Sequence, residues 1–404
     1  MSVLFFLSAF GLVTSGVYLC LVLLACPRFS LGKRTGWAET VALPAVSVFK
    51  PLHGAEPELR SNLESFFRQD YPEFELIFCA RQESDRGLAL AREIAAGYPG
   101  VKTHFLTSGP PRFANAKVSS LERMRTVASH DLFVISDSDV RVARNYLREV
   151  VQPLSDPRVG LVTCVYRGVT KFGFVAQLDA VGKTVEMTSG VLVAELLEGM
   201  KFALGPTMAT RRELIEAVGG FEELGRYYAD DFVLGNRLAD SGKKVVLSRH
   251  VIELAIVDPG FWGSITNQLR WAKSTRHSRP LGHLGSGLTY AVPYGLLGFA
   301  WGIFSGQGTL GLAMLAAAVA NRMLQAWAVS TRVVDSEQRF RSTLIYPVRD
   351  LLGFCVWVAS YFGSGMRWRG EAFVFRPGGT IEKAGPPSDA NNGVAADTVA
   401  RDRV

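Results

Sequence analysis

Apolar residues are distributed unevenly along this chain, with long uncharged runs near both ends and most charged residues between them. The first run, residues 2–25, contains no charged residue and is long enough to cross a hydrocarbon core of about 30 Å. It has no basic start, its apolar stretch is too long for a secretory signal peptide, and Pro27-Arg28 is a poor cleavage context. The run therefore predicts a retained membrane anchor.

Three further apolar runs lie near the other end of the chain. Residues 284–305 carry no charge, residues 309–330 contain one charged residue, Arg322, and residues 345–363 have Arg349-Asp350 in their first turns. The last run could span the membrane with this pair near its surface, or it could be re-entrant. We expect two or three membrane spans here.

The central region alternates between two kinds of apolar pattern. Short apolar runs predict buried strands at residues 45–51, 74–79, 131–136 and 159–164. Apolar residues at helical spacing predict helices at residues 58–67 and 87–96. This alternation predicts an α/β fold whose parallel sheet has helices on both faces. Ligands of such sheets bind at the carboxyl ends of the strands.

These patterns divide the chain into five segments. We predict an N-terminal anchor at 1–26, a linker at 27–43, a globular domain at 44–280 that ends in an interfacial amphipathic helix, a membrane region at 281–370 and a polar, disordered tail at 371–404.

Charge and cysteine content add orientation and compartment to this picture. The first basic residues, Arg28, Lys33 and Arg34, follow the anchor directly, so the positive-inside rule places the central domain in the cytoplasm, at the inner membrane if the source is bacterial. The net charge of +7 suits a protein that lies against anionic lipid and binds an anionic nucleotide, although it could simply aid solubility. The five cysteines show no metal-binding spacing, which indicates reduced thiols.

Two groups of acidic residues are candidates for catalysis. Asp137-Ser138-Asp139 follows a predicted strand directly, where two carboxylates in one turn can bind Mg²⁺ or Mn²⁺ bridging a diphosphate. Acidic turns are common, so the tripeptide alone is a weak signal. Asp230-Asp231 opens a helical run; one of them could be a general base, or both could merely cap the helix.

Several basic and aromatic residues could line the same site. In the basic amphipathic stretch 266–279, Arg270 could bind a pyrophosphate and Trp271 could form a wall of the acceptor site, while the stretch as a whole could lie in the membrane interface. Lys117 could reach a phosphate or be solvated. The turn after the first strand, Lys50, Leu52, His53 and Gly54, could line a nucleotide base or simply end the strand. The six histidines predict no zinc site.

Taken together, these motifs resemble the ceramide glucosyltransferase family, a lipid-directed branch of the glycosyltransferases with the GT-A fold that has bacterial relatives in hopanoid lipid synthesis. The resemblance extends from about residue 46 to residue 279. The matching segments are VSVFKPLHG, NLESFFRQDYPEFEL, ISDSDVRV, VGLVT, GGF, YADDF and LRW, with WRG at 368–370 further on. The family implies a Rossmann-like, mixed and mostly parallel sheet.

The resemblance also implies roles for individual residues. Asp85 matches the aspartate that contacts uridine, although Glu83 lies close by. Asp137 and Asp139 match the metal site, with Asp139 as the direct ligand, and Asp231 matches the general base with Asp230 beside it. The last family motif begins with Gln or Arg, and Asn267 at that position is a departure from the motif; Arg270 and Trp271 are kept.

The reaction implied is a single displacement with inversion, from a UDP-sugar to the hydroxyl of a membrane lipid. The expected partners are a UDP-sugar, a divalent cation, the membrane and a lipid acceptor, with no nucleic acid. Glucose transfer to ceramide is the main reading, and transfer of N-acetylglucosamine or glucose to a hopanoid or another lipid alcohol is the alternative. A polysaccharide synthase would need more spans, and a non-catalytic scaffold would not need all these carboxylates.

Overall fold

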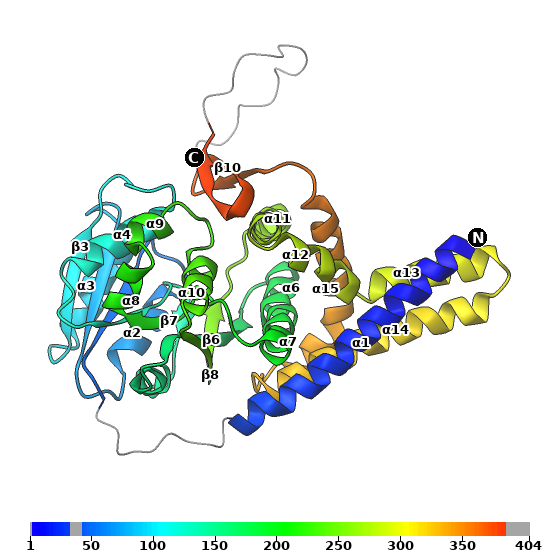
Figure 1. The fold of residues 1–404 in the computed structure, drawn as a ribbon, viewed down its shortest axis with the longest axis horizontal. Coiled ribbons are helices and arrows are strands. Elements are labelled where there is room, and N and C mark those ends of the chain that lie inside the picture. Colours follow the sequence, from blue (N-terminus) through cyan, green and yellow to red (C-terminus); the bar gives the residue numbers. More distant parts are fainter. Residues whose placement is uncertain (1, 33–42, 385–404) are drawn as a thin grey trace, which may run out of the picture.

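The protein, seen here as a computed structural model that describes residues 2–32 and 43–384, is built around one curled sheet with helices packed against it (Figure 1). The strand order in this sheet is β3-β2-β1-β4-β7-β6-β8-β5. The strands are β1 (Val46–Pro51), β2 (Phe74–Ala80), β3 (Lys102–Thr107), β4 (Leu132–Ile135), β5 (Val140–Arg141), β6 (Val159–Val169), β7 (Met208–Arg211) and β8 (Lys244–Ala255).

Most neighbouring strands run parallel. β1 pairs parallel with β2 and β4, β2 with β3, and β6 with β8, whereas β7 is antiparallel to β4 and β6, and β5 to β8. Consecutive residues of β1 and β2 are buried, and since consecutive side chains point to opposite faces, both faces of these strands are covered. The predicted fold class, a mostly parallel α/β sheet with helices at both ends of the chain, is confirmed.

The two helices predicted in the central region, at residues 58–67 and 87–96, are observed within one residue of these bounds. The helices that accompany the sheet are α2 (Leu59–Phe67), α3 (Arg86–Ala96), α4 (Ala116–Arg125), α5 (Tyr146–Val151), α6 (Phe174–Val181), α7 (Thr188–Glu198), α8 (Arg212–Ala217), α9 (Gly220–Leu224), α10 (Asp230–Asp240) and α11 (Gly260–Ser278), with the short η1 (Gln152–Ser155) and the π-helical η2 (Gly182–Met187).

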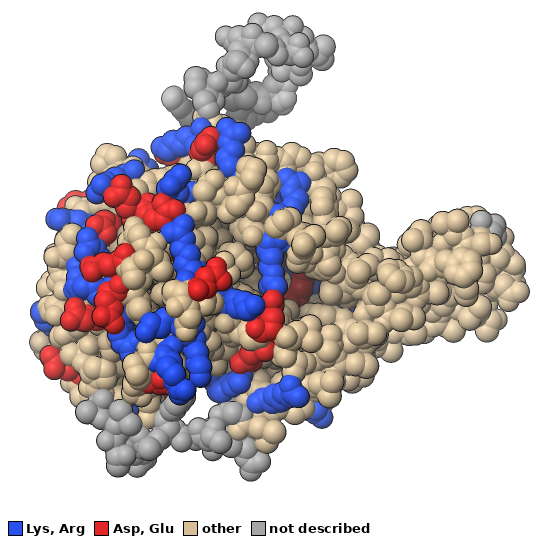
Figure 2. All heavy atoms as spheres, in the orientation of Figure 1, with Lys and Arg blue, Asp and Glu red and all other residues tan. Residues whose placement is uncertain are grey.

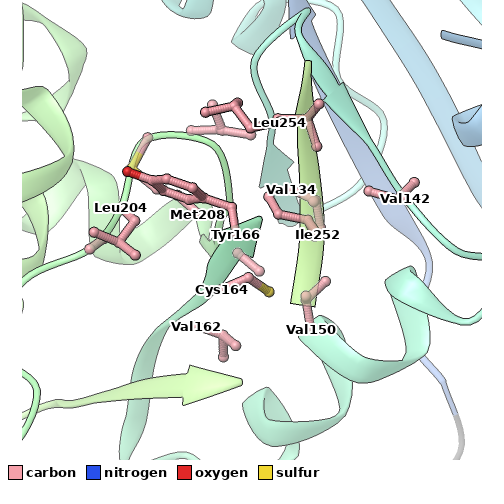
Figure 3. Close-up of a cluster of buried hydrophobic side chains, with 14 of the residues drawn as sticks. Val134, Val142, Val150, Val162, Cys164, Tyr166, Leu204, Met208, Ile252 and Leu254 are labelled. Carbon is pink, nitrogen blue, oxygen red and sulfur yellow. The ribbon is translucent and has the colours of Figure 1, made fainter. Parts of the chain in front are cut away.

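The centre of the core lies between β4, β6, β8 and α5. Figure 3 shows Val134, Cys164, Ile252 and Val150 from these four elements close together, and all four side chains are buried. Packing at this density leaves strand β4 little freedom to shift. It therefore fixes the chain just before Asp137.

A second, three-stranded sheet corrects the predicted tail. Strands β9 (Gly365–Trp368), β10 (Glu371–Phe375) and β11 (Ile381–Lys383), with the short η4 (Pro377–Gly379), form a sheet of order β11-β10-β9. Disorder from residue 371 onward was therefore wrong as far as residue 384, because Phe373, Phe375 and Ile381 are buried in a small core of their own. Residues 385–404 of the predicted tail, and 33–42 of the predicted linker, lie outside the described residues.

The remaining helices account for the apolar runs. α1 (Ser2–Gly32) continues past the predicted end of the anchor, and α14 (Gly308–Arg332) and α15 (Arg339–Ala359) are also long and apolar enough to cross a membrane. A fourth candidate is the pair formed by 280–289 (α12, Pro280–Ser286, with η3, Gly287–Thr289) and α13 (Val292–Phe304), which is bent by 49°. α1, α13 and α14 extend side by side away from the sheet (Figure 1), and the face of this arm in Figure 2 is almost free of charged side chains.

A buried ion pair joins three of these helices. Arg322 of α14 lies 3.4 Å from Asp350 of α15, and both side chains are at most 2% exposed. The Asp350 carboxylate also accepts hydrogen bonds from the backbone N–H groups of Ala291 (3.0 Å) and Val292 (2.8 Å) at the start of α13. Asp350 thus neutralises the buried charge of Arg322 and accepts hydrogen bonds from N–H groups that have no partner within α13.

We expect replacement of Arg322 by Met to lower the stability of the protein by about 3–5 kcal/mol, because Asp350 would keep a buried charge without its cation. The thermal unfolding midpoint of the purified full chain in detergent measures this loss. Arg332→Met, at the exposed end of the same helix, is the control and should leave the midpoint nearly unchanged. Equal midpoints for the two variants would mean that the pair contributes nothing.

Candidate active site

The two predicted acid groups lie close together, on either side of Gly205, and we call the site that they form the acid cleft. A Cβ atom placed on Gly205 would lie 3.1 Å from Oδ2 of Asp231 and 3.6 Å from Oδ2 of Asp137. The N–H of Gly205 donates to Oδ2 of Asp231 at 2.5 Å, and the N–H of Phe232 donates to its Oδ1 at 2.8 Å. Both oxygens of Asp231 are therefore held by the backbone, and a side chain at residue 205 would enter the space between the two carboxylates.

Lys117 is part of this cleft rather than a solvated loop residue. Its Nζ lies 2.7 Å from Oδ1 of Asp137 and 4.0 Å from Oδ2 of Asp230, and its side chain is 14% exposed. Asn115 sets this position, because its side-chain oxygen accepts from the N–H of Lys117 and caps α4. The amide nitrogen of Asn115 also donates to Oδ1 of Asp230 at 3.2 Å, which ties α4 to α10.

Burial and the repulsion of neighbouring carboxylates raise the pKa of Asp139, Asp230 and Asp231. Burial, followed by the charge of Asp137, raises the pKa of Asp139 to about 7. Burial, followed by the charge of Asp230, raises the pKa of Asp231 to about 6, and burial also raises the pKa of Asp230. For Lys117 burial acts to lower the pKa, but the carboxylates of Asp137 and Asp230 outweigh it and raise the pKa.

The predicted metal site fits a cation only in part. Oδ1 of Asp139 is buried and has no hydrogen-bond partner among the described residues, which suits an atom that coordinates a cation. Within residues 2–32 and 43–384, however, no three His, Cys, Asp or Glu side chains lie close enough together to hold a metal. The chain therefore offers two carboxylates, and the remaining ligands of Mg²⁺ or Mn²⁺ would be phosphate oxygens and water.

The turn after β1 is joined to the turn after β2 through Asp85. Oδ2 of Asp85 accepts from the N–H of Gly54 and Oδ1 from the N–H of Gly87, both at 2.8 Å. A Cβ on Gly87 would lie 2.4 Å from the carbonyl oxygen of Gly54, so the two turns approach closely enough to require glycine. Glu83 instead forms an ion pair with Arg92 at 2.5 Å, and so does not share the position of Asp85.

The other residues of the first turn have different environments. Lys50 is fully buried; its Nζ donates to the backbone oxygen of Asp137 and lies 3.8 Å from the ring centroid of Phe66. Burial lowers the pKa of Lys50 to about 7 although Asp137 and Asp139 act against this. Lys50 thus binds the backbone of the acidic turn through its buried ammonium group. Of the next two residues, Leu52 is buried and His53 is exposed.

Helix α11 brings Arg270 to Tyr228, two residues before Asp230, and Trp271 to Lys183. The guanidinium of Arg270 lies 5.8 Å from the ring centroid of Tyr228, and its Nε is buried with no hydrogen-bond partner in the described part of the chain. Trp271 is 41% exposed, and Nζ of Lys183 lies 4.7 Å from its ring centroid. Arg270 thus has a donor without an acceptor among the described residues, and Trp271 exposes its indole ring.

Gln268, rather than Asn267, makes the polar contacts at the start of the last motif. Its amide nitrogen donates to Oδ1 of Asp179 at 2.7 Å, and its amide oxygen accepts from Arg349 of α15. Arg349 also pairs with Glu186 at 2.9 Å. The helix that carries Arg270 is therefore bound to a candidate membrane helix through buried polar groups.

Sequence reasoning missed several residues of the site, among them Gly205, Tyr228, Lys183 and Asn115. Lys183 lies on the π-helical turn η2, and no regular periodicity of the sequence signals such a turn. Asn115 could have been found, because an Asn just before apolar residues at helical spacing, Val118, Leu121 and Met124, is typical of a helix cap. The other predicted residues are placed as described, and their roles stay predictions.

Comparison with known proteins gives three kinds of match. The sequence model of the family described as Glycosyl transferase family 21 matches residues 5–381. The chain is 29% identical over 209 residues to Ceramide glucosyltransferase 1 of Caenorhabditis elegans, covering 52% of this chain and 45% of that protein. It is 23% identical over 351 residues to Ceramide glucosyltransferase 3 of the same organism, covering 85% and 75%. The chain thus spans less than half the length of the first of these relatives.

Among solved structures, a mannosyltransferase from Pyrobaculum calidifontis in complex with GDP-Man and Mn2+ is 19% identical, covers 88% of this chain and 99% of its own, and has a TM-score of 0.49.

Proposed function

Since this chain belongs to glycosyl transferase family 21, we propose that it transfers a sugar from a nucleoside diphosphate donor to the hydroxyl of a membrane lipid. The observation that carries the proposal is the meeting of Asp137 and Asp231 across Gly205 in one cleft. The lipid acceptor is supported by the ceramide glucosyltransferase relatives and by the candidate membrane helices. The donor we propose is UDP-glucose and the acceptor ceramide, with UDP-N-acetylglucosamine and a hopanoid alcohol as the alternative pair.

In this proposal Asp231 is the general base. It takes the proton of the acceptor hydroxyl as the oxygen attacks the anomeric carbon, in a single displacement with inversion, and this requires a distance of about 3 Å between the two oxygens. The two backbone N–H groups on its carboxylate fix the orientation of Asp231. Asp230 is the neighbour of Asp231 in the chain, and its own carboxylate is held by Asn115 and Lys117.

The donor diphosphate is bound by groups of both signs. Asp137 and Asp139 would hold a divalent cation, which neutralises charge on the leaving nucleoside diphosphate when it is bound. Arg270 binds the pyrophosphate through its free Nε–H, and the Asp85-Gly54 turn binds the nucleoside. Trp271 forms a wall for the lipid acceptor, which enters from the membrane beside α11. The basic residues that follow the first apolar run, Arg28, Lys33 and Arg34, support a cytoplasmic position of this site.

The direct test is sugar transfer by membranes that contain the full chain. Labelled UDP-glucose and UDP-N-acetylglucosamine are each supplied with ceramide and with a hopanoid alcohol, and lipid-bound label is measured. We expect label on one acceptor with one donor. Transfer to neither acceptor from either donor would reject both proposed substrate pairs.

The rate of transfer should also depend on pH in a defined way. A base is active only when deprotonated, and burial together with Asp230 raises the pKa of Asp231 to about 6. The rate should therefore be constant above about pH 7 and fall about tenfold per unit below pH 6. The other titratable groups that act on this carboxylate, or face it across the cleft, are Asp230, Lys117, Asp137, Tyr166 and Tyr228. A rate at saturating donor that stays constant from about pH 8 to pH 5 would contradict this role.

A further inference from the structure

The tight turn between β9 and β10 carries an arginine in an unfavourable backbone conformation. Trp368 pairs with Glu371, so Arg369 and Gly370 form a two-residue hairpin loop with φ of 51° and 80°. Such loops favour Asn-Gly or Gly-Gly, because a side chain with a Cβ is strained at positive φ. An arginine at this position indicates a use for its side chain.

The hairpin is held at the rim of the acid cleft by Tyr228, two residues before Asp230. The ring centroid of Tyr228 lies 5.1 Å from that of Trp368 and 5.5 Å from that of Phe375. The N–H of Tyr228 also donates to the backbone oxygen of Gly379 at 3.3 Å. Figure 1 shows β10 next to α11, the helix of Arg270, and Arg270 lies against the same Tyr228 ring.

Trp368, next to Arg369, and Arg270 both lie against the Tyr228 ring, and the charges that act on Arg369 agree with this position. Enclosure lowers the pKa of Arg369, Asp137 and Glu56 act to raise it, and the like charge of Arg270 acts to lower it. Partial enclosure, followed by the charge of Arg369, lowers the pKa of His53. Arg369 is exposed at this rim, and its charge therefore acts on both the acidic turn and the turn after β1.

Among the described residues, Arg369 has no hydrogen-bond or ion-pair partner. In the described part of the chain no acceptor lies within hydrogen-bond distance of its guanidinium, whose nearest aromatic contact is the Trp368 ring at 5.7 Å. Arg270 likewise has a buried Nε without an acceptor. Two guanidinium groups that repel each other and lack acceptors form a site for an anion with several oxygens.

We propose that Arg369 binds the diphosphate of the nucleotide donor together with Arg270, so that the C-terminal hairpin completes the donor site. This inference rests on the proposed function, because it deepens the description of the same cleft. The segment WRG at 368–370, which has no role in the proposed reaction so far, thereby acquires one.

The test is binding of UDP and UMP to the purified full chain, measured by calorimetry in the presence of Mg²⁺. Arg369→Asn removes the cation and suits the turn better, so the unfolding midpoint should not fall. We expect UDP to bind about ten- to hundredfold more weakly, with a much smaller loss for UMP, which has one phosphate. Arg367→Asn is the control, because Arg367 is exposed on the same hairpin, and it should bind UDP like the wild type.

The outcomes separate this inference from the function on which it rests. Wild-type protein that binds UDP no better than uridine would reject the proposed donor class. Wild-type protein that binds UDP normally, with Arg369→Asn equal to it, would overturn the role of Arg369 alone. Should Arg369→Asn lower the midpoint, Arg369→Gln decides, because it keeps the Cβ and the backbone strain and loses the charge. Weaker UDP binding by Arg369→Gln supports the inference, and unchanged binding rejects it.

Discussion

Replacement of Asp231 by Asn should reduce sugar transfer by about 10²- to 10⁴-fold while the donor nucleotide still binds. The amide cannot take up the proton of the acceptor hydroxyl, but it has nearly the same size and lies in the same place. Asn has one acceptor oxygen for the two N–H groups of Gly205 and Phe232 that now share the carboxylate. A stability loss of about 1–3 kcal/mol is therefore expected as well.

Two measurements separate the chemical loss from the structural one. Transfer of labelled sugar gives the rate, and calorimetry with UDP gives donor affinity for the same preparation. Asp240→Asn is the matched control, because Asp240 is exposed at the other end of α10, and it should transfer sugar at the normal rate. Asp231→Asn protein that is folded, binds UDP and turns over normally would rule out Asp231 as the base.

The positions of the acidic groups could be predicted because each follows a strong local pattern. The run before Asp137 is a buried strand, and the carboxyl ends of parallel strands gather ligands. Nothing local, however, brings Asp230 and Asp231 to the same place, since they lie on α10 and meet Asp137 only through Gly205 and Lys117. The prediction that both acid groups belong to one site therefore rested on family resemblance and not on residue spacing.

Other features could not be predicted because they depend on contacts between distant segments. Asp85 caps α3, and its bond to Gly54 forms only because β1 and β2 are paired. Gln268 had no predicted role, and its partners Asp179 and Arg349 come from elements far away in sequence. The strands β10 and β11 were not predicted, because their short apolar segments are surrounded by Gly and Pro.

Replacement of Asp139 by Asn should remove the effect of divalent cations on donor binding. Oδ1 of Asp139 is buried and has no partner among the described residues, so in the absence of a cation this carboxylate costs free energy. A neutral amide removes that cost, and the unfolding midpoint without ligand should stay the same or rise. A residue that only supported the fold would show the opposite change.

The decisive comparison is UDP affinity with Mg²⁺ and with a chelator. Wild-type protein should bind UDP about ten- to hundredfold more tightly with Mg²⁺, because the cation bridges carboxylate and diphosphate. Asp139→Asn should bind UDP equally under both conditions, at the level of the chelated wild type. Asp131→Asn is the control, because Asp131 is exposed at the opposite end of β4 and pairs with Arg212 there. If Mg²⁺ raised the UDP affinity of Asp139→Asn as much as that of the wild type, Asp139 would not be a ligand of the cation.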